Sequence, residues 1–258
     1  MDSRVDGKVA VVTGASRGIG LATALELARS GAAGVVITSR KPENIEPARD
    51  ELIAAGVSED RVLALAARAD SEEAAAKAMA ATVEAFGSVD ILVNNAGTNP
   101  SAGPLMTVDL GAVDKTWEVN LRAPLLWVRA AYAASMEQNG GTIINVASIG
   151  GLRPSAITGA YNVLKAGLVH MTRQLAFELA PTIRVNAVAP ALVRTRLAGM
   201  LLQDEEAAAR AHPLGRIGEP EDVARLITFL ASDASSWMTG AIVPVDGGMT
   251  EASASGIA

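Results

Sequence analysis

The sequence predicts a doubly wound α/β fold, in which a parallel sheet carries helices on both faces. Short apolar runs rich in Val and Ile alternate along the chain with longer amphipathic stretches rich in Ala and Leu. The apolar runs show little polar/apolar alternation, which is typical of strands that are covered on both faces. A glycine-rich turn at 14–20 separates the first apolar run from the first amphipathic stretch.

The elements of the first half follow in the order that this fold requires. A strand at 9–12 leads through the turn into a helix over 21–30, which Gly31 ends, and then into a strand over 34–39. Strand, helix and strand together make a right-handed crossover. The pattern predicts further helices over 46–55 and 71–86 and strands over 61–66 and 90–94.

The second half continues the alternation. A long helical stretch over 109–138 is interrupted near Asn120 and Pro124, because a proline inside a helix removes one hydrogen bond. Strands are expected over 142–147, 184–189 and 241–245, and helices over 160–180 and 219–232. The total is about seven parallel strands with no linker between units, so we expect one domain over 1–258. The segment 191–213 is the expected substrate lid.

Composition excludes several classes of function. Half of the 258 residues are hydrophobic, the net charge is -6, and neither sign of charge forms a long run, which argues against a nucleic-acid or anionic-membrane partner. The absence of cysteine excludes disulfides and thiolate chemistry. The N-terminus lacks the apolar region of a signal peptide, and the uncharged stretch 91–108 is too rich in Asn and Pro to cross a bilayer. A cytoplasmic protein is the expectation.

The glycine-rich turn has the context of a dinucleotide site. Gly14 allows a sharp turn after the strand, and Gly18 and Gly20 let the backbone and the helix N-terminus approach a diphosphate. Strand, turn and helix in this order predict a Rossmann-like nucleotide-binding unit. The expected cofactor contacts in the turn are Gly14, Ser16, Arg17, Gly18, Ile19 and Gly20.

The end of the second strand indicates which dinucleotide binds. An NAD site usually places an acid there, but this chain has Ser39 and Arg40, and no acid before Glu43. Arg17 and Arg40 could instead bracket a 2′-phosphate, which favours NADP(H), although both could also be solvated surface arginines. Asp70 is either a contact of the adenine amino group or a helix N-cap near Ser71.

A second group of residues indicates acid/base chemistry. Tyr161 and Lys165 are four residues apart in a predicted helix, so they share one face. A neighbouring ammonium favours the phenolate and lowers the pKa of a tyrosine, which can then give or take a proton. The same spacing arises by chance on exposed helices, but the chain has only two tyrosines. Ser148 follows a predicted strand, where side chains face the ligand crevice, and could hold a carbonyl oxygen.

These motifs resemble the classical short-chain dehydrogenase/reductase family from about Lys8 to Gly248. The resemblance rests on several motifs in the family's order: the turn at 13–20, Asn-Asn-Ala-Gly at 94–97, Asn120, Ser148, Tyr161 with Lys165, the segment 190–195, and Val-Asp-Gly-Gly at 245–248. It implies that Tyr161 is the general acid/base and that Ser148 polarises the substrate carbonyl. Lys165 would lower the pKa of the tyrosine and bind the nicotinamide ribose, and Asn120 would help to hold a proton-relay water.

The resemblance implies further contacts and an assembly. Asn95 is an expected adenosine-side contact, Asn94 would tie strands together, and Val193 and Thr195 would contact the nicotinamide. A homotetramer is also implied, with interfaces on the helices around 125–136 and 161–179.

Two positions depart from the family pattern. Ala191 stands where the family usually has glycine, which would strain the nicotinamide loop if that position needs a positive φ. Leu164 stands before the lysine, where a small residue is common. Neither departure removes a reacting group.

The substrate is the least determined part of the prediction. The lid offers Leu192, Leu197, Met200, Leu201 and Leu202, which either bind an apolar carbonyl compound or pack against the body as an amphipathic helix. We expect an NADP(H)-dependent ketone or aldehyde reductase that takes a small-molecule carbonyl or alcohol substrate.

Other functions remain open from sequence. The alternative substrate is a 3-oxoacyl thioester, although the segment 136–140 lacks the basic residues that would meet an acidic carrier protein. A non-catalytic NADP(H)-binding sensor or assembly subunit is a further alternative, disfavoured by the intact Ser148, Tyr161 and Lys165. A metal-dependent hydrolase is weaker still, because no carboxylate lies in ligand spacing with either histidine, His170 or His212.

Overall fold

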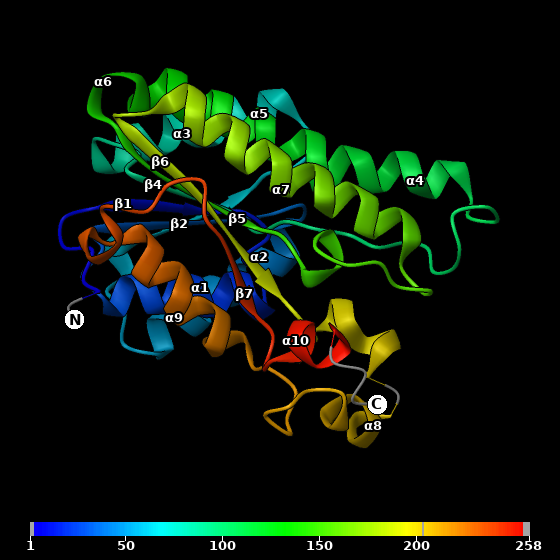
Figure 1. The fold of residues 1–258 in the computed structure, drawn as a ribbon. Coiled ribbons are helices and arrows are strands. Elements are labelled where there is room, and N and C mark those ends of the chain that lie inside the picture. Colours follow the sequence, from blue (N-terminus) through cyan, green and yellow to red (C-terminus); the bar gives the residue numbers. More distant parts are fainter. Residues whose placement is uncertain (1–2, 203, 255–258) are drawn as a thin grey trace.

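The computed structural model describes residues 3–202 and 204–254, which build a single seven-stranded sheet with helices on both faces (Figure 1). All strand pairs are parallel, in the order β3-β2-β1-β4-β5-β6-β7. The predicted doubly wound α/β class is therefore confirmed. The strands are β1 (Val9–Val12), β2 (Gly34–Ser39), β3 (Val62–Ala66), β4 (Ile91–Asn94), β5 (Gly141–Val146), β6 (Ile183–Pro190) and β7 (Ile242–Val245).

Two layers of helices cover the sheet. One layer contains α1 (Gly18–Arg29), α2 (Pro42–Ala54) and α9 (Pro220–Ala231). The opposite layer contains α3 (Glu72–Phe86), α5 (Ala123–Ala131) and α7 (Gly159–Leu179), with α4 (Leu110–Trp117) extending beside α7 (Figure 1). Two short helices, α8 (Glu205–Arg210) and α10 (Met249–Ala254), have no counterpart among the predicted elements, whereas α6 (Glu137–Asn139) lies at the end of the stretch predicted over 109–138.

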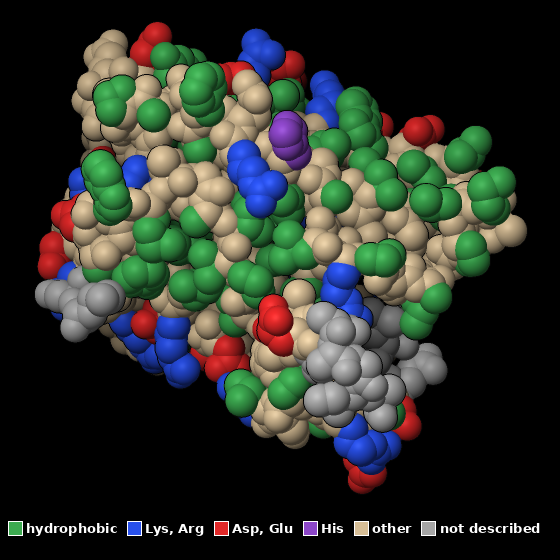
Figure 2. Space-filling view, in the orientation of Figure 1, with side chains coloured by type: hydrophobic (Ala, Val, Ile, Leu, Met, Phe, Trp, Pro, Cys, Tyr) green, Lys and Arg blue, Asp and Glu red, His purple; other side chains and the backbone are tan. Residues whose placement is uncertain are grey.

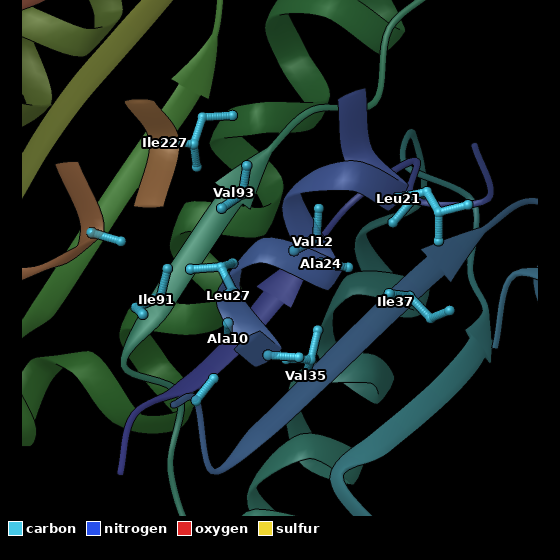
Figure 3. Packing of buried hydrophobic residues seen from close by; sticks show 14 of the residues in the cluster. Ala10, Val12, Leu21, Ala24, Leu27, Val35, Ile37, Ile91, Val93 and Ile227 are labelled. Atoms are coloured by element: carbon cyan, nitrogen blue, oxygen red, sulfur yellow. The ribbon is translucent and has the colours of Figure 1, made fainter. Parts of the chain in front are cut away.

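The two sides of each central strand feed two separate cores. Ala10 and Val12 of β1 pack toward α1, beside Leu27 of α1 and Ile227 of α9 (Figure 3). Val11, between them, points to the other side and joins the core under α3, α5 and α7. The strands are continuous apolar runs for this reason, because each face of the sheet is covered.

The predicted interruption of the long helix is a π-helical turn. It spans Glu118–Arg122 and joins α4 to α5. Pro124 has no N–H, so the carbonyl of Asn120, four residues earlier, cannot receive its usual α-helical hydrogen bond. The wider turn accommodates this missing donor.

The strand order reverses beside β1, and this reversal positions the site. β2 and β3 lie on one side of β1, and β4 begins the other side. Ligands in such sheets bind at the carboxyl ends of the strands next to this reversal. In Figure 1, α8 and α10 lie at this edge, beyond the ends of β6 and β7. Within the described residues, no helix combines the length and the apolar character that a bilayer crossing requires.

Candidate active site

A cavity of about 700 Å³ lies at the carboxyl edge of the sheet. Its walls come from the glycine-rich turn, from the segments after β2 to β6, and from the segment predicted as a lid. Fourteen of the sixteen predicted site residues line it, whereas Gly20 and Asn120 do not. The fourteen are Gly14, Ser16, Arg17, Gly18, Ile19, Ser39, Arg40, Asp70, Asn95, Ser148, Tyr161, Lys165, Val193 and Thr195.

Two glycines of the turn have a positive φ and lie close to neighbouring segments. Gly14 has a φ of +64°, and a Cβ there would lie 2.7 Å from the Cα of Ala96. Gly18 has a φ of +57°, and its Cβ would lie 3.2 Å from the methyl group of Thr195. The turn therefore exposes bare backbone at the N-terminus of α1, which is the geometry that a diphosphate requires.

Gly20 lies against Asn95 and does not line the cavity, in contrast to its prediction as a cofactor contact. It is buried, and a Cβ there would lie 2.4 Å from the Nδ2 of Asn95. That Nδ2 donates hydrogen bonds to the carbonyl oxygens of Thr13 (2.8 Å) and Gly14 (3.0 Å). Asn95 therefore holds the turn in shape while one side of it faces the cavity. The expectation for Asn94 is confirmed, because its amide donates to Asn145 on the neighbouring strand (3.0 Å).

The end of the cavity beside β1 and β2 carries two exposed cations. Arg17 and Arg40 both line it, and neither side chain forms an ion pair or hydrogen bond within residues 3–202 and 204–254. Ser39, at the end of β2, is the residue in the position where an NAD site usually has an acid.

Asp70 is the acid of this region, and two cations neutralise it. Its carboxylate accepts hydrogen bonds from Lys115 and from Arg68 (2.8 Å). Burial alone would raise the pKa of Asp70, but the hydrogen bonds from Lys115 and Arg68 outweigh it and lower the pKa to about 2. The N-cap of α3 is Ser71, whose hydroxyl accepts from the N–H of Ala74, so the N-cap interpretation of Asp70 is wrong.

Tyr161, Ser148 and Lys165 meet at the other end of the cavity. Tyr161 and Lys165 lie on the first turns of α7, and Ser148 caps the short 3₁₀ helix Ile149–Gly151 that follows β5. Ser148 hydrogen-bonds the Tyr161 hydroxyl and accepts from the N–H of Gly150 (3.1 Å). The Lys165 ammonium is buried, donates to the carbonyl oxygen of Val146 (2.7 Å) and lies 5.6 Å from the centroid of the Tyr161 ring.

The pKa values of this pair differ from the expectation. Burial raises the pKa of Tyr161 to about 12, although the hydrogen bond from Ser148 acts in the opposite direction. Burial also lowers the pKa of Lys165 to about 8. The predicted lowering of the tyrosine pKa by lysine is absent here, because the ammonium is held at the Val146 carbonyl and not at the phenol oxygen. Tyr161 is consequently protonated at neutral pH in this structure.

Asn120 does not face the cavity, in contrast to its prediction as a side chain near a relay water. It is completely buried, and its amide forms two 2.8 Å hydrogen bonds with the backbone N–H and carbonyl of Thr98. Its side chain thus fixes the segment that follows β4. Residues 97–99 of that segment line the cavity, so Asn120 acts on the site through them.

The departure at Ala191 causes no backbone strain. No non-glycine residue in the described part of the chain has a positive φ, Ala191 included. Its N–H donates to the carbonyl of Val245 (3.1 Å). Glycine is therefore not required at this position. Leu164 is partly buried on α7 and does not line the cavity.

The segment 191–213 covers the cavity with two short helices, the 3₁₀ helix Arg196–Leu201 and α8. Leu192 and Leu197 line the cavity as expected; the side chains of Met200 and Leu201, and residue 203, lie outside the described part. Leu202 does not line it. The face of α8 toward the cavity carries small side chains, the alanines at 207, 208 and 211. Their helical spacing was the sequence signal that could have predicted this face.

Arg153 and His212 are among the polar cavity residues that were not predicted as site residues. Arg153 lies on the loop after β5 and donates to the carbonyl of Met249 (2.9 Å), which links that loop to α10. His212 follows α8 and was considered only as a metal ligand. Neither belongs to a motif, and their positions depend on how the lid and the C-terminal helix fold back over the sheet.

A nicotinamide dinucleotide fits this arrangement. The bare backbone of the turn suits a diphosphate, the arginines mark the adenosine end, and the Tyr161 group lies at the far end of the same cavity. Val193, Thr195 and Tyr161, which line this cavity, are the residues that would hold the redox-active ring of the dinucleotide.

Comparison with known proteins identifies the family. The family model described as enoyl-(acyl carrier protein) reductase matches residues 14–250. The human dehydrogenase/reductase SDR family member 4 is 40% identical over 245 residues, covering 93% of this chain and 87% of the relative. The tropinone reductase-like 3 protein of Erythroxylum coca is 38% identical over 248 residues, covering 95% and 94%.

Solved structures agree with this relationship. A putative short-chain alcohol dehydrogenase from Sinorhizobium meliloti has a TM-score of 0.89 and 35% identity, with 97% of this chain and 99% of that chain covered. A putative gluconate dehydrogenase from Agrobacterium tumefaciens has a TM-score of 0.89 and 30% identity, with 96% and 98% covered. The protein therefore belongs to the classical short-chain dehydrogenase/reductase family, a family of oxidoreductases that use a nicotinamide cofactor.

Proposed function

We propose that this protein transfers hydride between NADP(H) and a carbonyl compound or the corresponding alcohol, acting mainly as a ketone or aldehyde reductase. The observation that carries the proposal is one cavity that joins two unpaired arginines at the adenosine end to Tyr161, Ser148 and Lys165 at the other. The bound cofactor supplies the hydride. The residues of the chain hold the carbonyl, move the proton and position the cofactor.

Tyr161 is the proposed proton donor in the reductive direction. With a pKa of about 12, its hydroxyl is protonated at neutral pH, which is the form that can protonate an alkoxide as it develops. Ser148, already hydrogen-bonded to that hydroxyl, would donate to the same substrate oxygen. Lys165 would exchange the Val146 carbonyl for the nicotinamide ribose. An ammonium moved toward the phenol oxygen would then lower the pKa of Tyr161 from its value in this structure.

The preference for NADP(H) rests on charge. A 2′-phosphate near Arg17 and Arg40 would gain two charge-assisted hydrogen-bonding partners that are not engaged elsewhere. Asp70 would not repel it strongly, because Lys115 and Arg68 neutralise that carboxylate. No acid at the end of β2 is present to bind the 2′-hydroxyl of NAD.

The lid supports a moderately apolar substrate. Leu192, Leu197 and the alanines of α8 line the substrate end of the cavity. Such a surface favours a carbonyl compound with hydrocarbon next to the reacting group. The relative from Erythroxylum coca is named tropinone reductase-like 3, and tropinone is a ketone, which supports this substrate class.

A screen tests the proposal. Purified protein is mixed with NADPH and, in separate reactions, with ketones, aldehydes and 3-oxoacyl thioesters, while nicotinamide absorbance is followed. We expect oxidation of NADPH with ketones or aldehydes at a kcat/KM at least about tenfold above that with thioesters. A preference for 3-oxoacyl thioesters would replace the substrate class by the alternative. Cofactor binding without turnover of any class would favour the non-catalytic sensor or assembly subunit.

We also propose a homotetramer, because apolar side chains are unpartnered on the helices expected to form interfaces. Leu125, Val163 and Phe177 are exposed, Phe177 by 83%, and Trp237 before β7 is fully exposed. Hydrophobic side chains recur over α7 and α9 in the surface view (Figure 2). Met136, at the end of the first expected interface, is instead in the core. Light scattering should give about four times the chain mass of 26.4 kDa, and a monomeric mass would refute the assembly.

A further inference from the structure

The lid wall of the cavity carries one buried polar atom that has no hydrogen-bond partner among the described residues, Nε2 of His212. Ala207, Ala208 and Ala211 line the cavity from one side of α8 and its end, and His212 follows them. Asp204, at the start of α8, also lines the cavity, but its carboxylate is engaged because it accepts from the N–H of Ala207 (2.9 Å). A wall of methyl groups therefore ends at an imidazole.

The hydrogen bonding of His212 defines its tautomer. The side chain is buried, with 3% of the residue exposed, and Nδ1 lies 2.7 Å from the carbonyl oxygen of Ala208. A carbonyl oxygen can only accept, so Nδ1 carries the proton. In the neutral imidazole, Nε2 is then an acceptor with a free lone pair. Nε2 is buried and has no hydrogen-bond partner in the described part of the chain.

The Asp246 carboxylate beside the ring offers Nε2 no donor. Asp246 interacts electrostatically with His212, but its two oxygens accept from the N–H groups of Gly248 (3.0 Å) and Thr250 (2.8 Å). An ionised carboxylate also cannot donate to a lone pair. Gly247 lies against the ring, since a Cβ there would be 3.5 Å from Cδ2. The imidazole is therefore held firmly from two sides, with its acceptor unsatisfied.

We propose that Nε2 of His212 accepts a hydrogen bond from a hydroxyl group of the substrate, so that the preferred substrates are hydroxy ketones or hydroxy aldehydes and the corresponding diols. This inference rests on the proposed function and narrows its substrate class. A buried acceptor without a partner is unfavourable, and a ligand donor that reaches it removes this penalty. Sites built around such a group discriminate strongly against analogues that lack the partner.

The charge of the cavity selects the kind of donor. A hydroxyl and an alkylammonium could each donate to Nε2. Arg153 and Arg196 line the same cavity, and the carboxylates of Asp204 and Asp246 already accept from backbone N–H groups, so a cationic ligand would gain no free counter-charge there. The neutral hydroxyl is therefore the donor that fits both the acceptor and the charge around it.

Matched substrates test this proposal by kinetics. The probes are ketones with a hydroxyl at increasing distance from the carbonyl, each beside its O-methyl ether, which keeps the oxygen but lacks the donor. Wild-type protein should prefer at least one hydroxy ketone over its ether by about tenfold to a hundredfold in kcat/KM, the range that corresponds to one buried hydrogen bond. Equal kcat/KM values across all pairs would overturn the inference.

Three variants assign that preference to His212. His212→Phe should bring kcat/KM for each hydroxy ketone and its ether to the same value, and His212→Gln, which can place an acceptor oxygen near the position of Nε2, should restore part of the preference. His170→Gln is the matched control, because His170 is exposed on α7 and does not line the cavity. A preference that survives in His212→Phe would overturn the assignment. NADPH affinity, measured in each variant, distinguishes a folded variant from a damaged one.

A spectroscopic measurement tests the same proposal without turnover. The chain has two histidines, so protein labelled with ¹⁵N-histidine gives two imidazole patterns, and His170→Gln assigns them. We expect His212 to show a protonated Nδ1 and an unprotonated Nε2, and the Nε2 signal to move when NADPH and the preferred hydroxy ketone bind. The opposite tautomer, or an unmoved signal at saturation, would overturn the proposal. Tyr161→Phe distinguishes failure of the proposed function from failure of this inference. If Tyr161→Phe retains turnover, the proposed function fails. If wild-type protein only lacks the preference for hydroxy ketones, the proposed function still holds and this inference alone fails.

Discussion

Tyr161→Phe is expected to lower kcat for carbonyl reduction by about 100-fold to 10,000-fold, the contribution typical of a positioned general acid. The substitution removes one hydroxyl and keeps the ring that lines the cavity. In the reductive direction, the alkoxide that forms would then have no protein donor at the position of the Tyr161 oxygen. Affinity for NADPH should change little, because the turn, the arginines and Lys165 are all retained.

Tyr132→Phe is the matched control for this prediction. Tyr132 is the only other tyrosine, is half-buried beside the core under α3 and α5, and does not line the cavity. Its loss of a hydroxyl should leave kcat within about twofold, since substitutions outside special features have small effects. Both variants are measured by single-turnover kinetics with bound NADPH and by fluorescence titration of the cofactor. Near-normal turnover in Tyr161→Phe would refute its role as the proton donor.

Cofactor selectivity is the second large effect. Wild-type protein should bind NADPH more tightly than NADH, and replacing both Arg17 and Arg40 by alanine should weaken NADPH binding by about 100-fold or more. Each arginine is assigned a charge-assisted interaction with the 2′-phosphate, and one such interaction corresponds to about tenfold to a hundredfold in affinity. NADH binding should hardly change, because NADH lacks that phosphate.

The selectivity prediction has its own control and a salt test. Lys41→Ala removes a neighbouring cation that pairs with Glu43 (3.1 Å) and does not line the cavity, so NADPH affinity should be unchanged. Both arginines are exposed, so the preference for NADPH should also shrink as ionic strength rises. Equal dissociation constants of wild-type protein for NADPH and NADH, determined by calorimetry at low salt, would contradict the assignment.

Most of the fold could be predicted because its strands are buried on both faces. Continuous runs such as 9–12 and 34–39 follow directly from that burial, and Pro124 located the interruption of the long helix. The short helices α8 and α10 could not be predicted in the same way. Six-residue helices have little periodicity, and their stability depends on tertiary contacts with the body of the protein.

Site residues could be predicted where the residue type itself requires a particular backbone geometry. They could not be predicted where a neighbouring side chain or backbone group determines which way a residue faces. Gly14 and Gly18 have the positive φ angles that only glycine adopts readily, so their sequence pattern is informative. In sequence, Gly20 and Asn120 could not be distinguished from the predicted site residues that do line the cavity. In the structure, Asn95 lies against Gly20, and Thr98 hydrogen-bonds Asn120. His212 carried no motif, and its significance depends on a hydrogen bond made inside the lid.

The pKa of Tyr161 also depends on partners from other segments and not on the residue type alone. The four-residue spacing of Tyr161 and Lys165 predicted proximity correctly, because both side chains lie on one face of α7. It did not predict that the ammonium donates to the Val146 carbonyl while burial raises the tyrosine pKa. Side-chain partners of this kind depend on the strand that lies beside the helix.

The central claim is that one cavity brings a nicotinamide and a carbonyl carbon together beside Tyr161. NADPH with deuterium at the transferable position of the nicotinamide ring, mixed with the best ketone from the screen, tests this directly. We expect mass spectrometry to find one deuterium on the carbinol carbon of the product with wild-type protein and with Tyr132→Phe, and the rate to be lowered by about 100-fold or more in Tyr161→Phe. Product formed without deuterium on that carbon, or formed equally fast by Tyr161→Phe, would contradict it.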